Sequence, residues 1–205
     1  YFFTYIMVLS NKDAMPKKNN SLIPWIVLTV CVLPVIASTA LYHLWEPDGF
    51  VNNGELIEPV PLSDLVVPSI EDDVFLFSDL NGLWSFVSID SSECGEACIK
   101  KLYLMRQIRL TQGAEKDRLE RIHFSVGGEL QRTLIDEYDG TRFIAVSDVQ
   151  ALDAFGDLTA AEEYIFLIDQ IGNLMMRFPL TIDPSLMKKD VKKLLKISKA
   201  WKKIN

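Results

Sequence analysis

Histidine and cysteine are scarce in this chain, which has two histidines and three cysteines among 205 residues. No Ser-His-Asp set, phosphate-binding glycine loop or zinc-ligand spacing is present, which excludes the common hydrolase, nucleotide-binding and zinc-finger motifs. Proline is missing between Pro68 and Pro179. Cys31 lies inside a long apolar run, where a cysteine is most often a packing residue. The chemistry that remains therefore rests on Cys94 and Cys98.

Net positive charge is missing from the body of the chain. The formal net charge is −7, and residues 46–182 carry 25 acidic against 10 basic side chains. Nucleic-acid binding needs a basic face that neutralises phosphates, so we expect no nucleic acid as a partner. Residues 183–205 are the exception, because they carry eight lysines against two aspartates on a helical pattern. That segment predicts a docked helix with a solvated lysine face, or a helix that contacts anionic lipid or an acidic partner.

Acidic and basic residues are also missing from residues 22–45, which are strongly apolar. About 20 apolar residues cross the hydrocarbon core of a bilayer, so this run predicts one transmembrane helix. Lysines precede it and acidic residues follow it, and the positive-inside rule then places residues 1–21 in the cytoplasm and residues 46–205 outside. A cleaved signal peptide is the alternative, because small residues near the end of the run offer a cleavage site. We expect residues 1–14 to precede the natural start at Met15.

Strand and helix patterns alternate after the apolar run. Residues 46–72 are rich in Pro, Asn and Asp and predict an extended linker, which leaves residues 73–205 as the folded domain. The order of elements in that domain is βαβαβαββα, which predicts an α/β thioredoxin-like fold with a central mixed sheet flanked by helices. We expect strands at 83–90, 121–127, 142–147, 164–169 and 174–180, and helices at 97–113, 130–138, 149–156 and from Pro184 onward.

The cysteine pair stands where the first central strand meets a helix. Cys94 and Cys98 are four residues apart in "SSECGEACIKKL", a spacing that brings two Cα atoms to about 6 Å and allows a disulfide. A helix N-terminus stabilises a thiolate, and we expect Cys94 to be the more exposed, nucleophilic sulfur and Cys98 the more buried one. Three acidic neighbours oppose the thiolate and two lysines partly offset them: Asp90, Glu93, Glu96, Lys100 and Lys101. A redox couple, a copper site and a structural disulfide all stay open.

A family resemblance rests on three stretches, "LWSFVSID", "SSECGEACIKKLYLMRQIRL" and "YIFLIDQIGNLMMRFP". Over about residues 50–198 the chain resembles the Sco/SenC family, membrane-tethered thioredoxin-fold proteins involved in cytochrome c oxidase assembly, and in particular its divergent proteobacterial members. The resemblance implies that Cys94 and Cys98 bind copper as Cu(I) or cycle as a dithiol. It also implies a cytochrome c oxidase subunit or its assembly factors as partners, and a bacterial inner-membrane protein with a periplasmic domain.

The chain departs from the family pattern at the expected third copper ligand. Copper-binding members place a histidine shortly before the strand at 164–169, where this chain reads "DLTAAEEY". His43 lies at the end of the apolar run, and His123 lies in a predicted strand, where we expect an edge or surface imidazole. The cis-proline of thiol oxidoreductases is missing too. These departures favour thiol–disulfide exchange, which would make the chain an oxidoreductase, over Cu(I) delivery; a non-catalytic scaffold with a structural disulfide is the alternative.

Overall fold

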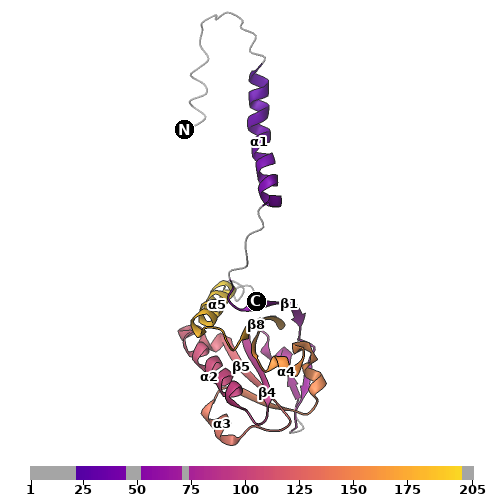
Figure 1. The fold of residues 1–205 in the computed structure, drawn as a ribbon, viewed down its shortest axis with the longest axis vertical. Helices are drawn as coiled ribbons and strands as arrows, with labels where there is room; N and C mark the ends of the chain where they lie inside the picture. Colours follow the sequence, from indigo (N-terminus) through magenta and orange to yellow (C-terminus); the bar gives the residue numbers. More distant parts are fainter. Residues whose placement is uncertain (1–21, 45–51, 71–73, 200–205) are drawn as a thin grey trace, which may run out of the picture. The chain divides into compact units, whose positions relative to one another are not determined.

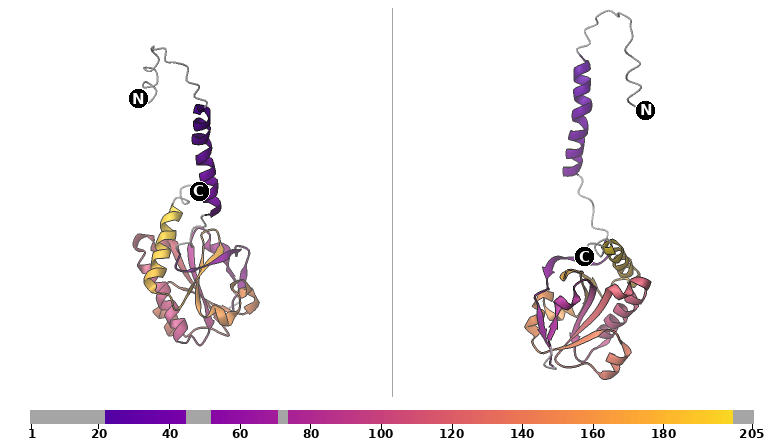
Figure 2. Two further views of the ribbon diagram at one scale, coloured as in Figure 1. Left: turned by 45° about the horizontal axis from the view of Figure 1, so that its top comes forward. Right: turned by 180° about the vertical axis from the view of Figure 1, so that it is seen from behind.

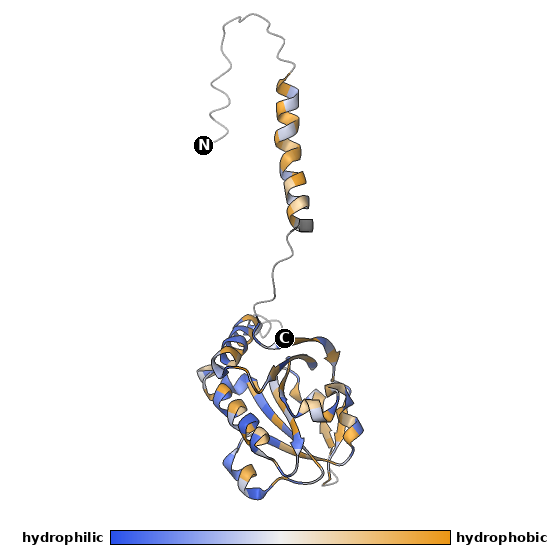
Figure 3. Cartoon of the chain, viewed as in Figure 1, coloured by the Kyte–Doolittle hydropathy of each residue, from blue (hydrophilic) through white to orange (hydrophobic). Residues whose placement is uncertain are grey.

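The computed structural model describes residues 22–44, 52–70 and 74–199, which fall into two compact units, residues 1–50 and 51–205 (Figure 1). The described part of the first unit is α1 (Ile23–Leu44), which contains Pro34. Its stretch Ile23–Leu41 is long and apolar enough to cross a membrane, a test that an N-terminal signal sequence also passes. Hydrophobic residues cover most of the length of α1 (Figure 3). The predicted helix is confirmed, while residues 1–21 and Trp45 lie outside the described residues.

The second unit is built on a six-stranded mixed sheet with the strand order β1-β8-β7-β4-β5-β6. Strands β4, β5 and β6 run parallel, whereas β7 is antiparallel to β4, β8 to β7, and β1 to β8. The predicted thioredoxin-like sheet is therefore confirmed, with β4 in the interior as its continuous apolar run indicates. The strand bounds are β1 (Glu55–Pro61), β4 (Trp84–Ser91), β5 (Leu119–Val126), β6 (Arg142–Val146), β7 (Tyr164–Ile168) and β8 (Asn173–Pro179).

Two hydrophobic cores cover the two faces of this sheet. One face packs against α2 (Glu96–Leu110), α3 (Arg132–Glu137) and α5 (Pro184–Ile197). The opposite face packs against η1 (Phe77–Leu80), η3 (Val149–Phe155), α4 (Leu158–Ala161) and a small sheet of β2 (Val66–Pro68) and β3 (Val74–Leu76). Figure 2 shows the sheet between these two layers. The short 3₁₀ helix η2 (Gly113–Arg118) joins α2 to β5. The helix predicted at 149–156 is 3₁₀, and α4 was not predicted.

The predicted linker over residues 46–72 is wrong for the part that the structure describes. Residues 55–61 form the edge strand β1, and Leu62 and Val67 are fully buried in the second core. The domain therefore begins near residue 52 rather than at 73. An edge strand buries little of its surface, so β1 lacks the alternating apolar pattern by which strands are recognised in a sequence.

The start of the domain is fixed to α5 by a buried carboxylate. Asp190 accepts hydrogen bonds from the backbone N–H groups of Asn53 at 2.6 Å and Gly54 at 2.9 Å. A Cβ at Gly54 would meet the ring of Phe178 at 2.5 Å, so the backbone approaches β8 more closely there than a larger residue allows. These contacts connect the first described residues of the domain to its last helix.

The helix α5 is docked against the sheet, as the first of the two interpretations predicted. Met187, Val191 and Leu195 are buried, and Asp183 caps the helix by accepting the Ser185 N–H at 2.8 Å. The lysines of the described part of α5 and the residues just after it all lie on the exposed side: Lys188, Lys189, Lys192, Lys193, Lys196 and Lys199. Contact of this lysine face with lipid stays a prediction, and Trp201 and Ile204 lie outside the described residues.

Candidate functional site: a buried dithiol and its polar neighbours

The cysteine pair forms a disulfide between the end of β4 and the first turn of α2. The Cα atoms of Cys94 and Cys98 are 5.1 Å apart, and Gly95 is the N-cap residue of α2. Cys94 has a φ of +43°, in the left-handed region of the backbone that residues other than glycine seldom adopt. Cys94 is 5% and Cys98 2% exposed, so Cys94 is the more exposed of the two, as predicted, but both residues are buried. The reason is that both residues pack into the core between the sheet and α2.

A row of polar side chains faces the disulfide from the two neighbouring central strands. Alternate residues of a strand point to the same face, and Ser88 and Asp90 of β4 lie on the α2 side together with His123 of β5. Ser88 and His123 are register partners, and the Ser88 Oγ lies 2.8 Å from the His123 Nδ1. Asp90 Oδ2 lies 3.7 Å from the same nitrogen. The three residues thus form one connected polar group beneath the disulfide.

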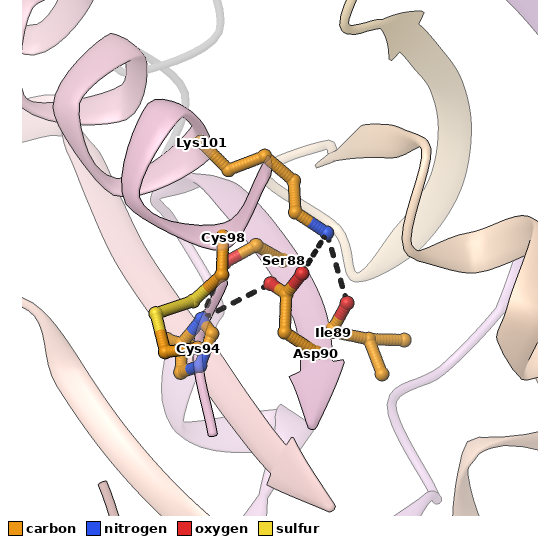
Figure 4. Close-up of a disulfide and its surroundings, with 7 residues drawn as sticks. Ser88, Ile89, Asp90, Cys94, Cys98 and Lys101 are labelled. Carbon is orange, nitrogen blue, oxygen red and sulfur yellow. Dashed lines mark hydrogen bonds and ion pairs between the residues drawn. A yellow bond between two sulfur atoms is a disulfide. The ribbon is translucent and has the colours of Figure 1, made fainter. Parts of the chain in front are cut away.

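Lys101 joins this group from α2. Its Nζ lies 2.7 Å from Asp90 Oδ1 and donates to the Ile89 carbonyl at 2.9 Å, as Figure 4 shows. Both side chains are buried, at 0% exposure for Lys101 and 5% for Asp90. Burial raises the pKa of Asp90 to about 6, although the Lys101 ammonium acts in the opposite direction. Burial likewise lowers the pKa of Lys101, against the attraction of Asp90. Lys101 therefore compensates the buried carboxylate of Asp90.

His123 is fully buried, and the expectation of an edge or surface imidazole is wrong. Its strand β5 lies between β4 and β6, so neither edge of the strand is open, and α2 packs against it. Burial, with a contribution from the Lys101 charge, lowers the pKa of His123 to about 3. The imidazole is therefore neutral near pH 7, and its Nε2 has no hydrogen-bond partner among the described residues. The sequence could have indicated this group only through strand pairing, because Ser88, Asp90 and His123 share one face of the sheet once β4 and β5 are paired.

Comparison with known proteins identifies the family of the domain. A family model described as "Transmembrane-like, thioredoxin-like, C-terminal domain" matches residues 84–198, which is more than half of the chain. The chain belongs to this family. Its thioredoxin-like domain has the fold of solved Sco proteins. A SCO1/SenC family lipoprotein from Bacillus anthracis is 16% identical at a TM-score of 0.52, over 68% of this chain and 99% of that one.

Two yeast structures extend the comparison to a copper-bound protein. Yeast Sco1 is 13% identical to this thioredoxin-like chain at a TM-score of 0.53, over 71% of this chain and 97% of that one. Yeast Sco1 with copper bound is 14% identical at a TM-score of 0.51, over 72% and 95%. At these identities the likeness concerns the fold alone. No curated protein sequence matches the chain.

The thioredoxin-like domain brings together donor atoms that suit a soft metal ion. One ligand atom each of Asp90, Cys98 and His123 lies within 4.8 Å of the others, and all three residues are buried. Cys94 is bonded to Cys98, so reduction would place a second sulfur at the same point. Thiolate and imidazole donors suit Cu(I), and the imidazole that the sequence lacks at residues 157–164 is present on β5 instead. Of the two nitrogens of His123, Nδ1 is engaged by Ser88 and Nε2 has no hydrogen-bond partner among the described residues.

The segment at residues 157–164 contributes charge rather than a ligand. It forms α4 and the entry to β7, and Asp157 caps α4 by accepting the N–H of Thr159 at 2.8 Å. Glu162 is exposed, and its negative charge adds to the raised pKa of Asp90. A carboxylate within 4.8 Å of Cys98 opposes a thiolate there, whereas the N-terminus of α2 favours one.

Proposed function

We propose that the chain is a membrane-tethered, Sco-like factor that acts in assembly of the copper centre of cytochrome c oxidase. In this proposal α1 is a single-pass anchor in a bacterial inner membrane, and residues 46–205 lie in the periplasm. The observation that carries the proposal is a closed Cys-x3-Cys disulfide at the junction of β4 and α2, beside a buried neutral imidazole. The partners would be an oxidase subunit or another assembly factor.

The first activity of the site is thiol–disulfide exchange. In the reduced chain, the Cys94 thiolate attacks one sulfur of the partner's disulfide, the partner's S–S bond breaks, and a mixed disulfide forms. Cys98 then attacks the Cys94 sulfur, which closes the Cys94–Cys98 bond and releases the partner as a dithiol. Two electrons pass to the partner, and the chain ends in the oxidised state of the structure. A dithiol donor of the same compartment would return it to the reduced state.

The second activity is delivery of Cu(I) as a cargo. The reduced Cys94 and Cys98 supply two soft thiolates, and His123 supplies the nitrogen donor. Ser88, at 2.8 Å from Nδ1, holds the ring orientation, which leaves Nε2 as the unpartnered nitrogen. Because Cu(I) binds the reduced pair only, oxidation of the cysteines would release the ion.

The test compares a Cys94→Ala/Cys98→Ala variant with a Cys31→Ala control in the full chain. Cys31 is a free, exposed thiol on α1 and is not one of the site residues, so its loss should leave both activities intact. We expect the double variant to stop oxidase copper-centre maturation and to lose Cu(I) binding in competition with a chromophoric chelator. Normal maturation in the double variant would contradict the proposal. A His123→Leu variant that bound Cu(I) as tightly as the parent would remove His123 from the donor set.

A scaffold with a structural disulfide is a second candidate, favoured by the burial of both cysteines. Exchange needs an accessible sulfur, and 5% exposure at Cys94 leaves little room for a partner in the oxidised state. A redox titration of the full chain separates the two candidates. A reduction potential below about −300 mV indicates a structural bond, whereas one near those of exchange catalysts supports the redox function.

A further inference from the structure

A polar pocket separate from the dithiol site lies toward the other end of α2 from the disulfide. It has a volume of about 220 Å³ and is lined by Arg106, Arg109, Leu110, Arg121, Glu137 and Asp139. Arg106 is eight residues beyond Cys98, a separation of about 12 Å along a helix at 1.5 Å per residue. None of these residues takes part in the dithiol site, so the pocket calls for a separate explanation.

Arg121 is the deepest of the three arginines. It is 3% exposed, and its Nη2 donates to the Asp139 carbonyl at 2.6 Å, whereas its Nε and Nη1 are buried with no hydrogen-bond partner among the described residues. Gly140, with a φ of +76°, lets the turn after α3 close over the guanidinium, since a Cβ there would lie 3.0 Å from Nη2. A buried cation with two unpaired donor atoms is costly unless an acceptor occupies the adjoining space.

The other two arginines add positive charge, and only some of their hydrogen-bond donors have partners among the described residues. Arg106 donates to the Glu137 carbonyl at 3.1 Å, and Arg109 donates to the Leu119 carbonyl at 2.7 Å. Burial first, and then the charges of Arg109 and Arg106, lower the pKa of Arg121, while Glu120 and Asp139 act in the opposite direction. The three guanidinium groups therefore lie close enough to repel one another.

The carboxylates near the pocket are not in direct contact with its most buried arginine. In the described part of the chain, neither Arg106 nor Arg121 forms an ion pair, and the one ion pair of Arg109 is with the exposed Asp117 at 3.4 Å. Arg121 contacts the backbone of Asp139 rather than its carboxylate. Glu137 likewise contacts Arg106 through its backbone carbonyl. The pocket thus keeps two guanidinium donors of Arg121 without partners among the described residues, although the side chains of Glu137 and Asp139 also line it.

We propose that this pocket binds a small tetrahedral oxyanion of the phosphate class. Guanidinium groups donate charge-assisted hydrogen bonds to the oxygens of such an anion, and the Nε and Nη1 of Arg121 are donors without a partner among the described residues. A phosphate group fits within 220 Å³ and would accept from Arg121, with Arg106 and Arg109 closing the site. The anion is either a free phosphate compound or a lipid phosphate headgroup.

Inorganic phosphate is the probe, titrated into the full chain in neutral detergent by calorimetry at low ionic strength. We expect saturable binding at one site, weakened about tenfold by Arg106→Gln and lost with Arg121→Met, because each removes a charge-assisted hydrogen bond. Arg106 is exposed, so its variant should fold even if the buried substitution at Arg121 does not. Arg142→Gln is the matched control, since Arg142 is an exposed arginine of β6 outside the pocket.

Three results would overturn the proposal. They are no saturable binding by the parent chain, an equal loss with Arg142→Gln, or equally tight binding of acetate at the same ionic strength. The source of the anion is separated by repeating the titration in bilayers of phosphatidylcholine with and without phosphatidic acid. Loss of the phosphate signal only with phosphatidic acid assigns the site to a lipid headgroup, and an unchanged signal assigns it to a free phosphate compound.

Discussion

Substitution of Lys101 by Met tests the buried charge pair beneath the disulfide. The change removes the ammonium that lies 2.7 Å from Asp90 and keeps a side chain of similar length, so the carboxylate is left buried without its partner. Breaking a buried ion pair from one side typically costs about 3–5 kcal/mol, most of it the penalty of the uncompensated charge. The double variant Asp90→Asn/Lys101→Met removes both charges, and we expect it to recover most of that loss.

The loss should depend on pH, because Asp90 can escape it by taking up a proton. Its pKa in the folded domain is about 6, against 3.8 for the unfolded reference, so the folded state holds this proton more tightly. The contribution of Asp90 to the free energy of unfolding is therefore largest at the acidic end of that window, and it falls by about 3 kcal/mol as pH rises through the window. Without Lys101 the pKa of Asp90 rises further, so the Lys101→Met loss should be largest at pH 7 and smaller at pH 5.

The assay is urea unfolding of residues 51–205, a compact unit with two hydrophobic cores of its own, followed by near-ultraviolet circular dichroism at pH 7 and pH 5. Lys100→Met is the matched control, because Lys100 is exposed and donates a hydrogen bond to the Leu180 carbonyl. We expect that control to cost less than about 1 kcal/mol. The reasoning is refuted if Lys101→Met costs no more than Lys100→Met at pH 7, or if the double variant is as unstable as the single one.

Three further predictions concern the same domain. Since burial lowers the pKa of His123 to about 3 from 6.5, acidification from pH 6.5 to 3 should remove up to about 5 kcal/mol of the His123 contribution to stability, a loss that the Asp90 contribution partly offsets. The loss of stability on acidification should therefore be smaller in His123→Gln than in the parent, as measured by urea midpoints. Asp190→Ala should cost about 1–3 kcal/mol and speed amide hydrogen exchange at Asn53 and Gly54, and unchanged exchange there would show that the carboxylate does not hold this segment. Reduction of the disulfide that Cys98 closes should lower stability by only about 2 kcal/mol, because the loop is short; a midpoint unaffected by reductant would contradict this.

The elements that could be predicted from the sequence are those with a strong local pattern. The apolar runs of β4 and β7 predict interior strands, and the Gly172-Asn173 turn predicts the hairpin of β7 and β8. Tertiary context decided the rest. The edge strand β1 carries no alternation because it buries few side chains, and η3 is wound as 3₁₀ although its apolar spacing resembles that of an α-helix.

Half of the candidate site could be predicted, and the other half depended on strand pairing. The position of Cys94 and Cys98 at the strand-to-helix junction follows from the order of elements. Their burial, and the approach of His123, depend on how β4 and β5 are registered and on how α2 lies over both strands. A single histidine in a strand gives no local sign of which face it occupies, so the sequence does not require that His123 approach the cysteines.

The clamp between Asp190 and the backbone at Asn53 and Gly54 also has a mechanical consequence. Any force that reaches the domain through its N-terminal side arrives first at these two residues. Their hydrogen bonds to α5 lie ahead of the β1–β8 ladder in the chain, so the load is divided between a helix and a strand edge before it reaches β4. The dithiol, attached to the central strand and α2, is thereby shielded from tension, and pulling at residue 52 should detach β1 before it disturbs Cys94 and Cys98.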